Sequence, residues 1–197
     1  MSTHYFREPK RPVRKFLISD FIRGVSVEFM VAEGLFSYRR VDPGTKLLIE
    51  SAVVREGDVV LDLGCGYGAI GITIAKAVRG VKVYMVDINK LAVELAKENV
   101  KRNGVTDRVK VFHGDLYEPI KGLVFNVILT NPPIAAGLGI IERIVTEAPK
   151  HLVSGGSLQM VLRKGENVVK DLMTKHFKNV KVLARKSGYT VLMGVKD

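Results

Sequence analysis

The chain of 197 residues contains a single cysteine, Cys65, and no apolar run long enough to cross a membrane. One cysteine excludes an internal disulfide and a zinc site built from several thiolates. A membrane helix needs about 18 consecutive apolar residues, so we expect no membrane association. The first 21 residues lack a continuous apolar segment and a small-residue cleavage site, so we predict no signal peptide. The four histidines lack metal-ligand spacing, and we assign no metal. These absences favour a protein of the reducing cytoplasm.

The net charge of +11 is concentrated at the two ends of the chain. Residues 1–24 carry six Lys or Arg against two acidic residues, 150–197 carry ten against three, and 25–149 carry fifteen of each sign. Cations gathered on part of a fold are an electrostatic footprint for a polyanion such as RNA. Solvated lysines that favour solubility, or stability in a hot-growing organism, are the alternative. The residues that we expect to hold phosphates include Lys10, Arg11, Arg14, Lys15, Arg163, Lys164, Arg185 and Lys186.

From residue 59 onward, short apolar strands alternate with helices. The pattern predicts strands at 59–63, 81–86, 109–112, 124–130 and 157–162, and helices at 69–78, 91–102, 139–148 and 167–176. This alternation indicates an α/β fold with a mostly parallel sheet covered on both faces. The last two strands, 180–184 and 190–195, are too closely linked for a crossover helix, so they should pair as an antiparallel hairpin. The predicted architecture is a Rossmann-like, seven-stranded sheet.

The N-terminal part follows a different pattern. Residues 25–32 alternate and are rich in Val and Phe, a turn follows, and 35–37 are predicted to return as the second strand of a small hairpin. Residues 43–45 form a turn that caps a helix continuing through residue 52. We therefore predict a basic segment and hairpin extension over 1–44, followed by one α/β domain over 45–197.

The segment Asp-Leu-Gly-Cys-Gly-Tyr-Gly, residues 62–68, joins the strand 59–63 to the helix 69–78. Its glycines allow a sharp turn and a close approach of the backbone to a ligand. Such a loop alone is weak evidence, because dinucleotide-binding enzymes use one too. Asp62, just ahead of the first glycine, would repel a pyrophosphate but suits the ammonium group of a methionine moiety. The loop therefore favours a ligand that carries such an ammonium.

Two further carboxylates end the next two predicted strands. Asp87 lies 23 residues after Gly64 and can accept hydrogen bonds from both ribose hydroxyls of an adenosine. Asp115 ends the third strand, where a carboxylate can accept from an adenine amino group. The three carboxylates thus suit three parts of S-adenosylmethionine (SAM). An NAD-type Rossmann fold is the alternative that the glycine loop and Asp87 alone leave open.

From about residue 36 to its C-terminus the chain resembles class I SAM-dependent methyltransferases, and residues 62–68 are similar to the first motif of that family. The resemblance implies that Asp62 holds the methionine ammonium, Asp87 binds the ribose, Ile88 packs on the adenine face and Asp115 reads the adenine amino group. Cys65 is interpreted as a small loop residue, because its sequence neighbours supply no base for a nucleophile. The full set of expected cofactor-binding residues is Phe36, Thr45, Asp62, Gly64, Cys65, Gly66, Gly68, Asp87, Ile88, Asp115, Leu116 and Asn131.

The most specific motif is Asn131-Pro132-Pro133-Ile134, directly after the strand 124–130. Ligands of open α/β sheets bind at the carboxyl ends of strands near the topological switch point, so this loop and the glycine loop should flank one crevice. An aromatic amine is a poor nucleophile, because its lone pair is delocalised into the ring. The Asn131 side-chain oxygen and the Pro132 carbonyl can accept its two N–H groups, which aims the lone pair at a methyl donor and stabilises the growing positive charge. A Pro-Pro turn that merely ends a strand is the alternative.

This loop resembles the Asn-Pro-Pro-aromatic motif of amino methyltransferases, a group that acts on adenine N6, guanine N2 and protein glutamine. The resemblance implies Asn131, Pro132, Pro133 and Ile134 as catalytic residues, although Ile134 stands where an aromatic residue is usual and gives less stacking on the acceptor. Enzymes that methylate pyrimidine C5 need a covalent cysteine near the fourth strand, and none is present there.

Residues 34–37, 41–48 and 131–137 more narrowly resemble the ribosomal RNA guanine-N2 methyltransferases of the small-subunit type, in particular their small archaeal stand-alone members. The resemblance implies that Phe36, Gly44 and Thr45 border the methionine end of SAM. We therefore predict a SAM-dependent N-methyltransferase of guanine N2 in ribosomal RNA, monomeric and with RNA as its partner. The alternatives are a protein glutamine or adenine N6 enzyme and a non-catalytic RNA-binding protein. Arg39 and Arg40 are expected to line the mouth of the crevice.

Overall fold

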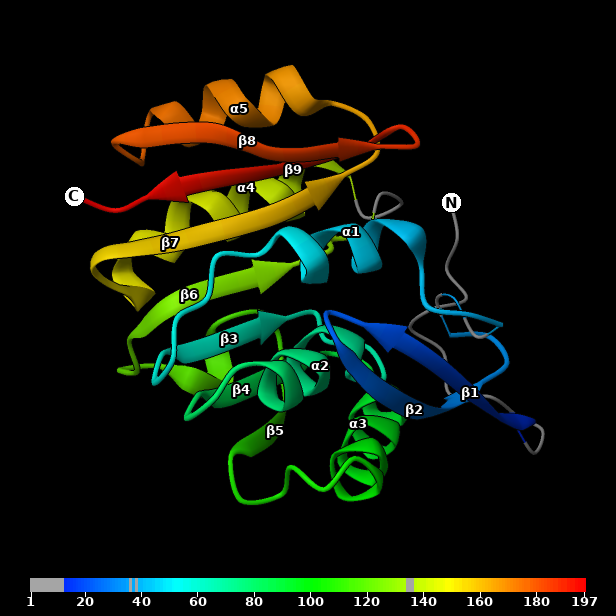
Figure 1. Ribbon diagram of the computed structural model, residues 1–197. Coiled ribbons are helices and arrows are strands. Elements are labelled where there is room, and N and C mark those ends of the chain that lie inside the picture. The colour runs from blue at the N-terminus through cyan, green and yellow to red at the C-terminus, as the bar shows by residue number, and fades with distance from the viewer. Residues whose placement is uncertain (1–12, 36, 38, 134–136) are drawn as a thin grey trace.

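The computed structural model describes residues 13–35, 37, 39–133 and 137–197, and its core is a seven-stranded sheet with the order β5-β4-β3-β6-β7-β9-β8 (Figure 1). The strands are β3 Val59–Leu63, β4 Lys82–Asp87, β5 Val109–His113, β6 Phe125–Thr130, β7 Leu152–Leu162, β8 Asn179–Lys186 and β9 Tyr189–Val195. Strands β3 to β7 pair in parallel, whereas β9 is antiparallel to both β7 and β8. The predicted α/β architecture and its antiparallel C-terminal hairpin are confirmed. Strand β7 begins at Leu152, five residues before the predicted start.

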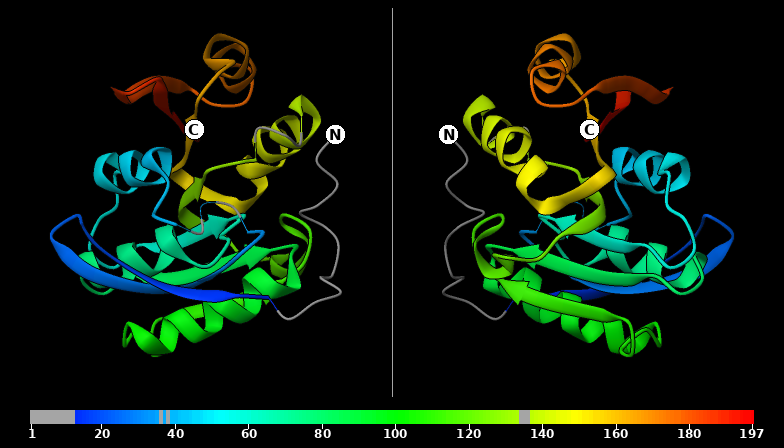
Figure 2. Two further views of the ribbon diagram at one scale, coloured as in Figure 1. Left: turned by 90° about the vertical axis from the view of Figure 1, so that its right-hand side faces the viewer. Right: turned by 90° about the vertical axis from the view of Figure 1, so that its left-hand side faces the viewer.

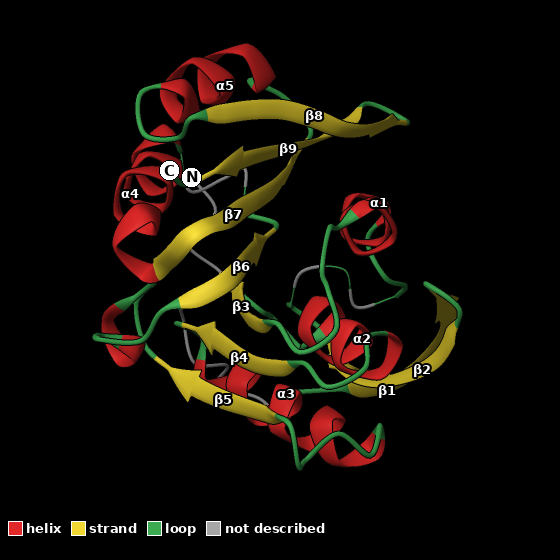
Figure 3. Cartoon of the chain, turned by 60° about the vertical axis from the view of Figure 1, so that its left-hand side comes forward, coloured by secondary structure: helices red, strands yellow, loops and turns green. Residues whose placement is uncertain are grey.

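Helices cover both faces of this sheet (Figure 3). One face carries α1 Pro43–Ser51, α2 Ala69–Ala77 and α3 Lys90–Arg102, and the other carries α4 Leu138–Glu147, α5 Glu166–Thr174 and the 3₁₀ turns η1 Glu118–Ile120 and η3 Ala148–His151. Helix α3 illustrates why these segments are helical, because the Asn89 side chain caps its first turn and Ala92, Leu95 and Ala96 form a buried stripe. Two apolar clusters, one on each side of the sheet, result.

An N-terminal hairpin is present, but its strands are β1 Lys15–Ile22 and β2 Val25–Ala32. The prediction that residues 35–37 pair with 25–32 is wrong. The hairpin turns at Arg23 and Gly24, which both have positive φ, the backbone of a type I′ turn that fits the strand twist. Strand β1 was missed because it buries little and therefore lacks a clear alternation. Among the described residues 33–35 the chain makes a turn, with the Leu35 side chain buried.

Strand β2 packs its apolar side chains onto α2 and α3, so the hairpin shares the core on that face of the sheet. Figure 2 shows the ribbon of the hairpin beside α3. Buried Asn99 of α3 fixes this contact, since its side chain accepts from the Met30 N–H at 2.6 Å and donates to the Met30 carbonyl at 2.9 Å. The boundary proposed after residue 44 stays a prediction. Within the described residues, no helix has the length and apolarity to cross a membrane.

The order of the strands reverses direction at β3 and β6, which makes their carboxyl ends the topological switch point. Leu63 and Thr130, the last residues of these strands, are paired in register, and the Thr130 hydroxyl donates to the Leu63 carbonyl at 2.8 Å. The chain segments that follow therefore leave the sheet side by side. Ligands of open α/β sheets bind at this position.

Candidate active site

The loop 64–68 leaves β3 at the switch point and turns into α2. Its backbone is held in place because the N–H groups of Gly64 and Cys65 both donate to the Val86 carbonyl, at 2.9 and 3.0 Å. Gly68, the N-cap of α2, has φ +99°, and a Cβ there would lie 2.7 Å from the Ile72 Cδ1 atom. A residue with a side chain would be strained at this position. The glycine loop predicted from the sequence is thus a tight connection between β3 and α2 that these hydrogen bonds hold in place.

Asp62 is completely buried beneath this loop. One carboxylate oxygen, Oδ2, accepts from the Gly71 N–H at 2.8 Å, whereas Oδ1 is buried with no hydrogen-bond partner among the described residues. Burial raises the pKa of Asp62 to about 7, with the Gly71 N–H opposing this and the charge of Asp87 adding to it. A buried polar atom without a partner is costly and indicates a missing ligand or water. The orphaned oxygen fits an ammonium group held directly or through water, as SAM would supply.

Asp87 ends β4 on the other side of the glycine loop and is buried as well. Its two oxygens accept from the N–H groups of Gly66 and Asn89, both at 2.8 Å, which fixes the carboxylate beside the loop. Burial raises its pKa, and the two N–H groups oppose the shift. The neighbouring Ile88 is 45% exposed, which is unusual for an isoleucine next to a buried carboxylate. An exposed apolar face beside a buried acceptor suits an adenosine.

Asp115 lies after β5 and forms an ion pair with Arg143 of α4 at 3.0 Å. Sequence analysis did not point to Arg143, because the pairing depends on how α4 packs. Both side chains are about half exposed, so the pair itself contributes about 0–1 kcal/mol to stability. A carboxylate accepts about four hydrogen bonds, so Asp115 retains capacity for an adenine amino group. Leu116 follows with φ +47° and packs against the apolar cluster on the α4 face.

Asn131 is the first residue after β6, and its side chain is tightly oriented. The Nδ2 atom donates to Asp42 Oδ2 at 3.1 Å and to Thr45 Oγ1 at 2.8 Å, which uses both of its hydrogens. Because a carboxylate can only accept, the nitrogen must face Asp42. The remaining polar atom, the acceptor Oδ1, is therefore the one left for a ligand. The sequence analysis assigned the accepting role to this oxygen, and that role stays a prediction.

Asp42 is the main residue that the sequence analysis did not assign to the site. It is buried at the N-cap of α1, where Oδ2 accepts from the Thr45 N–H at 2.9 Å as well as from Asn131. Its other oxygen accepts from the Tyr189 hydroxyl at 3.3 Å. An acidic residue three positions before Thr45 and directly before a proline is a helix-capping signal, but only the fold brings that cap to residue 131.

Other expected site residues are placed as follows. Pro132 is buried and Pro133 is exposed next to Asn131. Phe36 and Ile134 lie outside the described residues. Arg39 and Arg40 are exposed in the segment that leads to Asp42, with the Arg40 carbonyl accepting from Ser37.

Cys65 is buried within the glycine loop, and burial raises the pKa of its thiol, with the charges of Asp62 and Asp87 adding to the shift. A raised pKa disfavours the thiolate that a nucleophile requires. This environment agrees with the interpretation of Cys65 as a small loop residue. Within the described part of the chain, no group of three or more His, Cys, Asp or Glu is arranged to hold a metal ion.

Residues 26–193 match the family model of the methyltransferase small domain. The chain is 35% identical to the uncharacterized protein YbxB of Bacillus subtilis over the whole of both chains. It is 32% identical to the ribosomal RNA small subunit methyltransferase C of Aeromonas hydrophila, covering 96% of this chain and 57% of that enzyme. The structure is similar to that of the Thermus thermophilus 16S rRNA N2 G1207 methyltransferase in complex with AdoMet and guanosine, with a TM-score of 0.83. The two sequences are 27% identical, and the match covers 96% of this chain and 52% of that one. The chain thus spans about half the length of these two enzymes.

Proposed function

The chain belongs to the methyltransferase small domain family and is by that membership a SAM-dependent methyltransferase, and from this premise we propose that it methylates the exocyclic N2 amino group of guanine in ribosomal RNA. The observation that supports this proposal best is the orientation of Asn131, whose nitrogen is bound by Asp42 and Thr45 and whose oxygen is left to accept. An amino group presents two N–H donors to such acceptors, whereas a hydroxyl presents one and a ring carbon presents none. The relatives from Aeromonas hydrophila and Thermus thermophilus are both named as ribosomal RNA methyltransferases.

The chain's own residues divide the work at the switch point. Asp62 offers its orphaned Oδ1 to the cofactor ammonium, and Asp87 with Ile88 offers an acceptor and an apolar face to the adenosine. When bound, SAM supplies an electrophilic methyl group. Asn131 Oδ1 and the Pro132 carbonyl accept the two N–H groups of the guanine amine, so that its lone pair faces that methyl group. Positioning and preorganised acceptors then provide the catalysis, and no general base is required.

An Asn131→Ala variant tests this assignment. Removing one preorganised hydrogen-bond partner from a transition state costs about 10²–10³-fold in kcat, whereas the affinity for SAM measured by calorimetry should stay close to that of the unchanged protein. Asn179→Ala is the matched control, because Asn179 is exposed at the start of β8. Equal loss of transfer and of SAM binding would show that Asn131 has a structural role instead.

The acceptor is identified by incubating the protein and labelled SAM with total RNA, total protein or DNA. Nucleoside mass spectrometry of the labelled RNA should then yield N2-methylguanosine. Label in protein glutamine, or N6-methyladenosine in the digest, would replace the proposed acceptor with one of the alternative amines. Binding of SAM and RNA without any transfer would identify a non-catalytic RNA-binding protein.

A further inference from the structure

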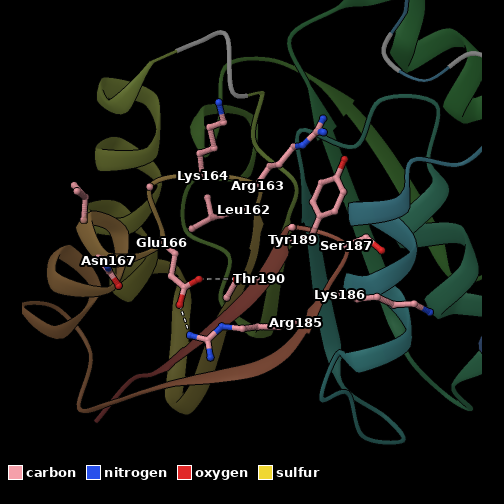
Figure 4. Close-up of a pocket in the computed structure, with 13 residues that line it drawn as sticks. Leu162, Arg163, Lys164, Glu166, Asn167, Arg185, Lys186, Ser187, Tyr189 and Thr190 are labelled. Atoms are coloured by element: carbon pink, nitrogen blue, oxygen red, sulfur yellow. Dashed lines mark hydrogen bonds and ion pairs between the residues drawn. The ribbon is translucent and has the colours of Figure 1, made fainter.

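A pocket with a volume of about 770 Å³ lies between two segments that are distant in sequence, 162–168 and 185–190 (Figure 4). The first segment connects β7 to α5 and the second contains the β8–β9 turn. Glu166 joins them, because its carboxylate accepts from the Thr190 hydroxyl at 2.6 Å and forms an ion pair with Arg185. The pocket is within the range of about 300–1,000 Å³ that is typical of ligand sites.

The pocket carries an excess of positive charge. Four cations, Arg163, Lys164, Arg185 and Lys186, surround Glu166, the single carboxylate of the lining. Arg185 neutralises that carboxylate, which leaves three cations in surplus. In the part of the chain that the structure describes, Lys164 and Lys186 form no ion pair, and both are exposed. Such an arrangement favours an anion with several charged groups rather than a single carboxylate.

The walls of the pocket are preformed. The β8–β9 turn contains Ser187 and Gly188, both with positive φ, which makes it a two-residue type I′ turn that fixes Lys186 opposite Tyr189. The Arg163 guanidinium lies 5.6 Å from the centre of the Tyr189 ring, a cation–π contact. Binding therefore requires little ordering of the backbone.

The pocket is joined to the catalytic loop through Tyr189. Its hydroxyl donates to Asp42, which in turn accepts from Asn131. The Tyr189 ring also packs closely on α1, since a Cβ at Gly44 would lie 2.6 Å from two of its carbons. In addition, β7 runs parallel to β6, so that Arg163 leaves the same edge of the sheet as Asn131. An extended ligand whose reactive group lies at Asn131 would pass over this pocket.

We propose that the pocket binds phosphodiester groups of the RNA strand next to the target nucleotide, an inference that rests on the proposed function. Duplex RNA hides its bases, so an enzyme that acts on an amino group must take an unpaired base or flip one out of the stack. A base that leaves the stack needs its flanking backbone held in place. Three surplus cations in a preformed pocket that Tyr189 and Asp42 link to Asn131 provide that hold for a polyanion of any sequence.

The test replaces Lys164 and Lys186 with Gln and measures binding of a labelled single-stranded ribosomal RNA fragment by fluorescence anisotropy at several salt concentrations. Each lost phosphate contact should reduce the slope of log K against log[salt] by about 0.7, and the loss of both contacts by about 1.4. If the two proteins bind equally at 1 M salt, this difference in slope makes the variant bind about 25-fold more weakly at 0.1 M salt. Lys82→Gln with Lys97→Gln is the matched control, because both lysines are exposed near the opposite edge of the sheet and the loss of charge is the same.

The affinity for SAM should be retained in the Lys164 and Lys186 double variant, and its KM for RNA should rise. A salt slope that changes no more than in the control pair would overturn the proposal. An equal loss of affinity for labelled polyglutamate would reassign the pocket to acidic protein segments and overturn it as well. Because anisotropy needs no methyl transfer, it reports on this pocket even if guanine N2 proves to be the wrong acceptor.

Discussion

The buried carboxylate of Asp62 should make the ligand-free protein less stable as the pH rises. Its pKa in the folded chain is about 7, against an ordinary value of 3.8. A group whose folded pKa is raised contributes stability that is fully present below the unfolded pKa and is lost as the pH rises through the folded one. Since one pKa unit corresponds to 1.36 kcal/mol, the free energy of unfolding should fall by about 4 kcal/mol between pH 4 and 8 from this group alone.

An Asp62→Asn variant isolates this contribution. Asparagine keeps an oxygen for the Gly71 N–H but cannot titrate, and its amide nitrogen takes the place of the orphaned oxygen at a pH-independent cost of about 1–3 kcal/mol. Urea unfolding of the ligand-free proteins, followed by circular dichroism from pH 5 to 8, should show the variant gaining stability relative to the unchanged chain as the pH rises. Asp171→Asn, at an exposed position on α5, is the control and should follow the unchanged chain. Parallel stability curves for Asp62→Asn and the unchanged chain would refute the reasoning.

The same group should make SAM binding depend on pH in the opposite sense. An ammonium favours the ionised carboxylate, so the affinity of the unchanged chain for SAM should decrease as the pH falls below about 7. The Asp62→Asn variant should bind SAM weakly at every pH. Saturating SAM should therefore stabilise the unchanged chain far more than the variant, because only a ligand that binds the folded state raises the free energy of unfolding.

Two further predictions concern neighbouring residues. Asp42→Ala should lose about 1 kcal/mol of stability, because the helix cap is removed. Its kcat should fall about 10–100-fold with little change in SAM affinity, because Asn131 loses a charge-assisted hydrogen bond of about 1.5–3 kcal/mol. Asp42→Asn keeps an acceptor and should restore part of kcat, whereas a change in KM for SAM alone would contradict this role. Gly71→Ala should cost about 1–3 kcal/mol in thermal unfolding, since its Cβ would lie 2.5 Å from Met85 Sδ. Gly139→Ala on α4, where a Cβ has nothing within 4 Å, should instead gain about 0.5–1 kcal/mol. Equal effects of the two substitutions would show that the contact with Met85 is not the cause.

The sequence was sufficient for the parts of the molecule that depend on local pattern. Strand 59–63 and helix 91–102 were placed within a residue of their observed bounds, because their apolar periods are unambiguous and glycine or asparagine marks their ends. Strand β1 was missed because a mostly exposed hairpin strand has no buried face to impose an alternation. The predicted start of β7 is too late, because two glycines interrupt the apolar pattern of residues 152–156 and a bulge interrupts their pairing with β6.

The residues of the candidate site also differ in whether the sequence pattern alone reveals them. Asp62, Asp87 and Asn131 could be found because each lies at the carboxyl end of a predicted strand or directly after it, and strand ends in a parallel sheet meet at one edge. Asp42, Arg143 and Tyr189 could not, because their partners are 89, 28 and 147 residues away in sequence and only the packing of α1, α4 and the C-terminal hairpin brings them together.

Asp42 and Asp62 show how one side-chain type serves two purposes within a single crevice. Asp42 receives hydrogen bonds from Thr45, Asn131 and Tyr189, so both of its oxygens accept and it holds the Asn131 amide in one orientation. Asp62 receives one hydrogen bond, from the Gly71 N–H, and its other oxygen is buried with no partner among the described residues. A ligand that reaches Asp62 would give a partner to an oxygen that has none among the described residues, and this would remove the desolvation cost of that atom. In the proposed function, the fold therefore fixes the orientation of Asn131 and leaves at Asp62 an oxygen for the ammonium group of SAM.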